Sequence, residues 1–192
     1  MAPIIQSQSR NQAGAPPAPD IDVQALRQRA REDIEQGAVT SDYDADAQVV
    51  IRLLNEALAT EIVCVLRYRR HYFMAKGILS EPVAAEFLEH AQQEQEHADS
   101  IAERIVQLGG GPDLNPDTLT KRSHAEYVEV ESLSDMIKEN LVAERIAIES
   151  YRAMINYLGD KDSTTRRMLE QIMAVEEEHA DDLSSLMQGM IR

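Results

Sequence analysis

The chain carries one six-residue motif twice, as EQEHAD at residues 94–99 and as EEEHAD at residues 176–181. The copies agree in five of six letters, and their histidines are His97 and His179. Each copy contains Glu-x-x-His. Positions i and i+3 of an α-helix share a face, so each copy directs a carboxylate and an imidazole the same way. Such a pair can bind a transition-metal ion through one oxygen and one nitrogen.

The repeat extends upstream of the motif. Glu61 is followed seven positions later by Tyr68, and Glu144 is followed seven positions later by Tyr151. The step from Glu61 to Glu144 nearly equals the step between the two histidines of the motif. The chain therefore reads as two helix pairs, each with Glu and Tyr on its first helix and Glu-x-x-His on its second.

Four long segments have the apolar periodicity of amphipathic helices and predict an all-α fold. They cover residues 44–76, 81–108, 132–158 and 162–189. Ser41 or Asp42 is expected to cap the first helix. The short connections inside each pair predict antiparallel hairpins. The long segment 109–131 predicts a crossover that joins the hairpins, and the alternative is an up-and-down bundle with a long loop.

The segment before the bundle has a different composition. We expect an N-terminal arm over residues 1–43 and the bundle over residues 44–192. Residues 1–20 are rich in Pro, Ala, Gln and Ser, which is typical of a disordered tail. Residues 21–36 are predicted to form a short amphipathic helix that ends at Gly37.

Four glutamates fall on the helix faces that should be apolar, each near the middle of its helix. They are Glu61, Glu94, Glu144 and Glu176. Burying ionised carboxylates without compensation costs several kcal/mol apiece. Two divalent cations would neutralise them, and His97 and His179 would complete the ligand set of a two-metal carboxylate centre. An isolated glutamate on such a face usually reaches water at the helix edge, but four at matched positions favour a metal centre.

Three polar residues lie near these glutamates on the same faces. Tyr68 and Tyr151 are expected to donate hydrogen bonds to ligand carboxylates or to take part in redox chemistry, and the alternative is a core tyrosine satisfied locally. Asn140 lies one turn before Glu144, either to orient a ligand histidine or to sit at the helix edge. Of the remaining groups, we expect His90 to pack rather than to ligate, His71 and His124 to lie on the surface, and Cys64 to lie in the core.

Composition narrows the function classes. The net charge of −15 over 192 residues argues against a general nucleic-acid binder, because phosphate binding needs clustered Lys and Arg. No apolar run is long enough to cross a bilayer, so we expect no membrane span. The single cysteine cannot form an internal disulfide, and no signal peptide is apparent, so we expect a cytoplasmic protein.

Over about residues 45–190 the ordered set of Glu, Tyr and Glu-x-x-His resembles the ferritin-like superfamily, and bacterioferritin most closely. The resemblance implies a ferritin-like four-helix bundle with a long crossover. It implies that Glu61 and His97 hold one iron ion, that Glu144 and His179 hold the other, and that Glu94 and Glu176 bridge both. It also implies a ferroxidase that oxidises Fe(II) with O2 or H2O2 and stores ferric mineral inside a protein shell.

The sequence departs from the bacterioferritin pattern at three places. Gln95 stands where the family has its haem-binding methionine, so haem is not expected. Gln93 replaces an aspartate of the family's inner iron route. The segment from His179 to Arg192 is too short to add the fifth helix of the larger, 24-subunit shells. The resemblance therefore favours a homo-oligomer of twelve subunits, with a dimer as the alternative.

Other functions remain open at the level of sequence. The same ligands suit manganese as well as iron. A peroxide-reducing di-metal enzyme, similar to rubrerythrin or manganese catalase, is the alternative within enzymes. From another class, the chain is a structural or cargo protein that docks through residues 1–43.

Overall fold

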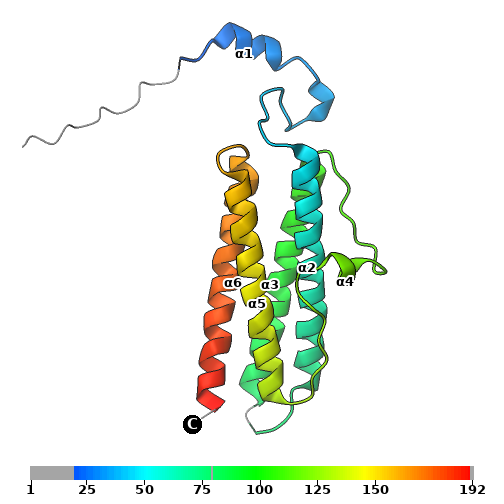
Figure 1. Ribbon diagram of the computed structural model, residues 1–192, viewed down its shortest axis with the longest axis vertical. Helices are drawn as coiled ribbons and strands as arrows, with labels where there is room; N and C mark the ends of the chain where they lie inside the picture. The colour runs from blue at the N-terminus through cyan, green and yellow to red at the C-terminus, as the bar shows by residue number, and fades with distance from the viewer. Residues whose placement is uncertain (1–19, 79, 191–192) are drawn as a thin grey trace, which may run out of the picture.

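The computed structural model describes residues 20–78 and 80–190, and its main body is a bundle of four long helices (Figure 1). The helices are α2 (Ala47–Met74), α3 (Ser80–Gln107), α5 (Leu133–Leu158) and α6 (Ser163–Met190). The described residues contain no β-strand. The all-α prediction is confirmed. The predicted disordered tail lies, up to residue 19, outside the described residues.

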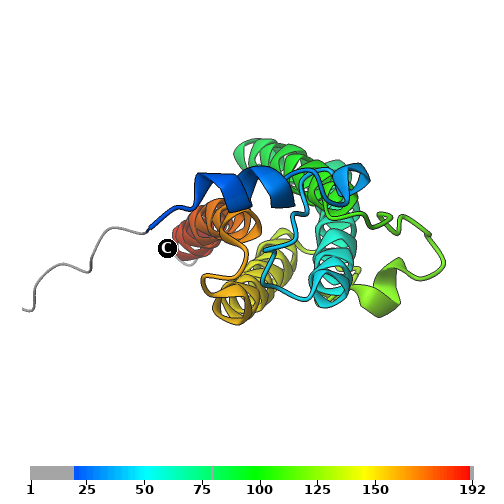
Figure 2. The ribbon, with the colours of Figure 1, turned by 90° about the horizontal axis from the view of Figure 1, so that it is seen from above.

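The long helices form two hairpins, α2 with α3 and α5 with α6, that stand side by side. Seen from above, the four helices occupy the corners of a square (Figure 2). The connection between α3 and α5 carries the short helix α4 (Leu119–Arg122) and runs along the outside of the bundle from one end to the other (Figure 1). The predicted crossover is confirmed, and it makes α3 and α5 run in the same direction.

The crossover is fixed by arginines that donate to backbone carbonyls. Arg122 donates from Nη1 to the carbonyl of Asn55 on α2 at 2.9 Å. Arg67, also on α2, donates from Nη1 to the carbonyl of Glu126 at 2.9 Å. A long loop leaves many backbone carbonyls without helical partners, and guanidinium groups with several N–H donors can satisfy them.

The helix ends follow local capping. The Asp46 side chain accepts hydrogen bonds from the backbone N–H groups of Gln48 at 3.0 Å and Val49 at 3.2 Å, so α2 begins at Ala47. The expectation that Ser41 or Asp42 caps this helix is wrong. The other ends of the long helices lie within two residues of the predicted positions.

The segment before the bundle forms a shorter helix than predicted. Helix α1 (Val23–Arg29) is capped by Asp22 and is followed by a 3₁₀ turn, η1 (Ile34–Gln36). Asp33 has a φ of 46°, in the left-handed region, and this interrupts the single helix expected over residues 21–36. Helix α1 lies over one end of the bundle (Figure 2), and none of its residues is buried.

Two large apolar clusters of the core are separated by a polar layer, and a third, smaller cluster joins α2 to α4. One cluster includes Leu58, Ile101 and Ile172, and the other includes Phe87 and Met136. On each long helix the glutamate predicted as a ligand falls between the stretches that enter the two clusters. The fold therefore places four carboxylates in the middle of a closely packed bundle, with apolar layers above and below.

Candidate metal centre

The four glutamates singled out by the sequence converge in the polar layer. Each long helix contributes one glutamate, and each of these residues is at most 1% exposed. His97 on α3 and His179 on α6 lie in the same layer, 8% and 2% exposed. The structure therefore brings together all six predicted ligand residues: Glu61, Glu94, His97, Glu144, Glu176 and His179.

One half of the layer is centred on His97. Its Nδ1 atom lies 3.3 Å from Glu61 Oε2 and 3.0 Å from Glu176 Oε1. The same nitrogen lies 3.8 Å from Glu94 Oε2. These four residues each offer a ligand atom, and the atoms lie within 4.8 Å of one another. This is the environment for one cation with a nitrogen ligand and three carboxylate ligands.

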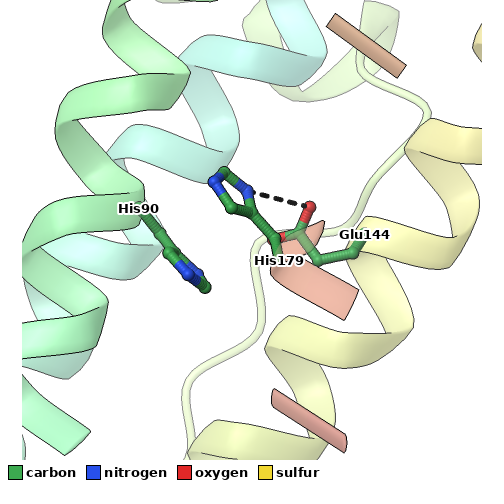
Figure 3. Close-up of side chains that lie close together, drawn as sticks. All are labelled: His90, Glu144 and His179. Atoms are coloured by element: carbon green, nitrogen blue, oxygen red, sulfur yellow. Dashed lines mark ion pairs between the residues drawn. The ribbon is translucent and has the colours of Figure 1, made fainter. Parts of the chain in front are cut away.

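The other half is centred on His179. Its Nδ1 atom lies 3.9 Å from Glu144 Oε2, an ion pair drawn in Figure 3. The same nitrogen lies 3.6 Å from Glu94 Oε1 and 3.5 Å from Glu176 Oε2. Glu94 and Glu176 thus turn one oxygen toward each histidine. A pair of carboxylates shared in this way can bridge two metal ions.

Whether a cation fits the layer can be tested by asking if the candidate ligand atoms already have hydrogen-bond partners. Most buried polar atoms in proteins are hydrogen-bonded. Seven atoms of the six residues are buried with no hydrogen-bond partner among the described residues. They are Glu61 Oε2, Glu94 Oε1, His97 Nδ1, Glu144 Oε2, both Glu176 carboxylate oxygens and His179 Nδ1. The atoms that face the middle of the layer are therefore the ones left free, as expected for ligands of metal ions.

The pKa values of residues in the layer are also consistent with a cation-binding site. Burial raises the pKa of Glu61 well above its usual value, and the charge of Glu94 raises it further. Burial also raises the pKa of Glu176, as do the charges of Glu61 and Glu144. Burial alone would lower the pKa of His97, but contacts with neighbouring carboxylates outweigh it and raise the pKa to about 12. Without a cation the layer holds protons, which a metal ion would displace.

Comparison with known proteins identifies the family of this chain. Residues 51–192 match the Ferritin family, described as a ferritin-like domain. The chain belongs to this family. The bacterioferritin of Mycobacterium avium is 30% identical over 141 residues, which cover 73% of this chain and 85% of that protein. A nutrient stress-induced DNA-binding protein of a Synechococcus species is 30% identical over 132 residues, or 66% of this chain and 74% of its own.

Solved structures of ferritin-family proteins superpose on this bundle. A dodecameric thioferritin, the bacterioferritin-related protein of Bacteroides fragilis, has a TM-score of 0.75 and 32% identity over 78% of this chain and 90% of its own. Dps from Thermosynechococcus elongatus has a TM-score of 0.70 over 72% of this chain and 90% of its own, but at 19% identity it supports the fold alone. The expected ferritin-like family and bundle are confirmed.

In this member of the ferritin family, the two tyrosines link the halves of the centre. Tyr68 on α2 donates its phenol proton to Glu144 Oε1 on α5, and Tyr151 on α5 donates to Glu61 Oε1 on α2. Each phenol therefore binds the carboxylate of the opposite helix. Each hydrogen bond leaves the second oxygen of that carboxylate, Oε2, turned toward a histidine.

Two sequence expectations near the centre are wrong. Asn140 accepts a hydrogen bond from Arg67 Nε at 2.9 Å, so it orients a buried arginine rather than a ligand histidine. His71, expected on the surface, is fully buried, with Nδ1 3.2 Å from Asn140 Oδ1. Both errors have the same cause, since α5 and the crossover cover a face of α2 that its own periodicity leaves polar. Cys64 is buried in the core as expected, and His124 is exposed.

Two residues of α3 contact His179 in ways that the sequence did not reveal. Gln93 Oε1 lies 2.6 Å from His179 Nε2 and accepts a hydrogen bond from it, so Nδ1 is the nitrogen that faces the carboxylates. His90 is buried and stacks on the His179 ring, with centroids 3.9 Å apart (Figure 3). Gln93 marks a departure from the bacterioferritin pattern, and that departure is the one signal that pointed to it.

The exposed surface of α3 carries Gln95, the residue at the haem-methionine position. Its side-chain amide donates to Asp99 at 2.9 Å. Across the described residues, no helix combines enough length with enough apolar character to span a bilayer.

Proposed function

We propose that this chain is a ferroxidase that oxidises Fe(II) at the six-residue centre and stores the iron inside a shell of its own copies. One observation carries the proposal: seven ligand atoms are buried without a hydrogen-bond partner among the described residues, and they surround two imidazoles that share two carboxylates. The proposal is supported by membership of the ferritin family.

The residues have distinct roles in this proposal. Glu61 and His97 hold one Fe(II), Glu144 and His179 hold the second, and Glu94 and Glu176 bridge them. Tyr68 and Tyr151 fix the outer oxygens of Glu144 and Glu61 by hydrogen bonds, so each carboxylate presents one oxygen to iron. Gln93 holds His179 in the tautomer that leaves Nδ1 unprotonated.

Iron is the substrate of the reaction. Each of two Fe(II) ions loses one electron, and the oxidant accepts both electrons together with two protons. H2O2 is then reduced to two molecules of water, or O2 to H2O2. The closely packed apolar clusters above and below the layer keep bulk water away from the ligands.

We propose further that the protein works as a homo-oligomer of twelve chains in the cytoplasm. The dodecameric structural relative from Bacteroides fragilis supports this number, with 32% identity over most of both chains. The buried free thiol of Cys64 suits a reducing compartment. Native mass spectrometry tests the number directly, because a species of two chains would contradict a closed shell.

The experiment that tests the function starts from metal-free, full-length protein without oxygen. Fe(II) is added, then O2 or H2O2, while ferric absorbance and iron per chain are followed. We expect a fast phase of two Fe(II) oxidised per chain and then uptake far beyond that ratio. Glu94→Gln with Glu176→Gln should abolish the fast phase. Glu96→Gln with Glu177→Gln removes the same charge from exposed positions on the same helices and should keep it.

Other results would select the alternatives. Oxidation that stops at two Fe(II) per chain and turns over with peroxide indicates a peroxide-reducing enzyme. Faster turnover with Mn(II) than with Fe(II) indicates a manganese enzyme. A wild type that behaves like the Glu94→Gln, Glu176→Gln variant would falsify the ferroxidase proposal and leave a structural role for the bundle.

A further inference from the structure

A second cluster of metal-ligand side chains lies beside the centre, between α3 and α6. Glu86 and His90 are one helical turn apart on α3, and Asp182 follows His179 by three positions on α6. Each offers one ligand atom, and these atoms lie within 4.8 Å of one another. His90 is 1% exposed, whereas the two carboxylates reach the surface. The cluster therefore extends from solvent to a buried imidazole.

The hydrogen bonds of His90 fix which nitrogen carries its proton. Nδ1 lies 3.2 Å from Tyr68 Oη, and Tyr68 already donates its own proton to Glu144. The phenol oxygen can only accept from His90, so Nδ1 is the protonated nitrogen. Nε2 then directs a lone pair toward Glu86 Oε1, 3.2 Å away. The lone pairs of His90 Nε2 and Glu86 Oε1 face each other and repel. A positive charge between them, either a proton or a metal ion, would remove this repulsion.

The surroundings of Glu86 favour a metal ion over a single proton. A carboxylate oxygen of Asp182 lies within 4.8 Å of one of Glu86, and Glu89 adds a third negative charge nearby. No Lys or Arg among the described residues forms an ion pair with Glu86 or Asp182. Burial raises the pKa of Glu86, and the charges of Asp182 and Glu89 raise it further, as expected where carboxylates crowd without a cation.

The spacing fits two ligands of one ion. Ligand atoms bound at about 2.1 Å, with an angle near 100° between them, lie about 3.2 Å apart. Nε2 of His90 and Oε1 of Glu86 are separated by 3.2 Å. One imidazole with two carboxylates is a ligand set that suits divalent first-row transition metals.

The cluster also has a route to solvent and a link to the centre. Glu86 and Asp182 line a surface pocket of about 420 Å³ between α3 and α6. His90 lies behind them, and its ring stacks on His179 (Figure 3). Its Nδ1 reaches Glu144 through the Tyr68 hydroxyl. A cation bound at this cluster would lie between the pocket and one half of the di-metal centre.

We propose that Glu86, His90 and Asp182 form a third cation site, which takes a divalent first-row transition metal ion from solvent. We name these residues the outer site. The inference that the outer site passes Fe(II) to the di-metal centre rests on the proposed ferroxidase function, whereas binding of the ion does not.

The test counts Co(II) ions bound per chain to the metal-free, full-length protein by equilibrium dialysis and elemental analysis. We expect three in wild type, two in Glu86→Gln with Asp182→Asn, and one in Glu94→Gln with Glu176→Gln. Glu103→Gln with Asp181→Asn removes the same charge from exposed positions of α3 and α6 and should still bind three. Asp182→Asn alone is the substitute if the double variant does not fold, and it should also bind two.

The outcomes separate the two proposals. Two ions in wild type and two in Glu86→Gln with Asp182→Asn would overturn the outer site and leave the di-metal centre standing. One ion in wild type, lost in that variant but kept in Glu94→Gln with Glu176→Gln, would overturn the di-metal centre and keep the outer site. If the outer site delivers iron, its double variant should also need a severalfold higher Fe(II) concentration for half-maximal oxidation.

Discussion

Single polar side chains buried beside the candidate metal centre join neighbouring segments by hydrogen bonds. Arg67 is 1% exposed and donates to Asn140 and to the carbonyl of Glu126, so its charge is held by oxygen atoms on two neighbouring segments. His71 contacts the same asparagine oxygen. A buried charge is tolerated when its donors are satisfied, and here the satisfied donors also join α2 to α5 and the crossover.

His71 makes the stability of the protein depend on pH. Burial lowers its pKa to about 4, and the nearby charge of Arg67 acts in the same direction. The ordinary value of 6.5 applies when the chain is unfolded. The unfolded chain therefore binds more protons between pH 6.5 and 4, and stability falls as the pH falls through that range.

We expect the metal-free protein to lose up to about 2 kcal/mol through this residue between pH 6.5 and 5. Urea unfolding at the two pH values should show a smaller loss in His71→Gln than in wild type. His124→Gln, which changes an exposed histidine, should keep the wild-type loss. Equal losses in all three proteins would show that His71 is not the titrating group.

At the scale of elements, one cluster of side chains ties the segment before α2 to the start of α6. Asp162 accepts from Tyr43 Oη at 2.7 Å and from Arg104 Nη2 of α3 at 3.0 Å for each oxygen. Thr165 Oγ1 accepts from Arg104 Nε at 2.7 Å. Asp162 and Arg104 are 4% and 8% exposed, so this ion pair is buried where the two hairpins meet.

Substitutions of the residues in this cluster should lower the free energy of unfolding by different amounts. Tyr43→Phe removes one hydrogen bond and should cost about 1–2 kcal/mol of unfolding free energy. Asp162→Ala leaves the Arg104 charge buried without its partner and should cost about 3–5 kcal/mol. Denaturant unfolding of metal-free protein measures both. Tyr157→Phe, at an exposed tyrosine of α5, is the control and should be near neutral. Equal costs for the Tyr43 and Asp162 variants would contradict this ranking.

For the molecule as a whole, the proposed di-metal centre would make stability depend on the supply of metal ions. Metal ions that bind only the folded chain stabilise it by about 2.7 kcal/mol at a hundred times the dissociation constant. We expect the unfolding temperature of wild type to rise with Co(II) concentration.

Thermal unfolding with and without Co(II) measures how far bound metal ions raise the unfolding temperature. The Glu94→Gln, Glu176→Gln variant should respond to Co(II) far less than wild type, while Glu103→Gln should respond as wild type does. A wild type that is indifferent to Co(II), at concentrations where dialysis shows binding, would mean that the ions do not reach the buried layer.

Much of this molecule follows from periodicity in the sequence, and the rest depends on which segments pack against which. The positions of Glu61 and Glu144 on apolar faces, and the length of the crossover, are local properties that predict a bundle with a polar layer. The partner of Asn140 is not local, since it is an arginine on another helix. Sequence reasoning placed His71 by its own helix alone and missed the segments that cover it.

The internal repeat has a consequence for the symmetry of the centre. Each tyrosine donates its hydrogen bond to a carboxylate of the other hairpin. One hairpin alone would therefore lack the tyrosine that orients its own glutamate, whereas two identical hairpins related by a twofold axis would supply both tyrosines. The halves of this chain differ: Ile172 and Val175 occupy the positions of the second half that correspond to His90 and Gln93 in the first. The two halves of the centre are therefore not equivalent, because His179 contacts His90 and Gln93, whereas the matching residues of the second half are apolar.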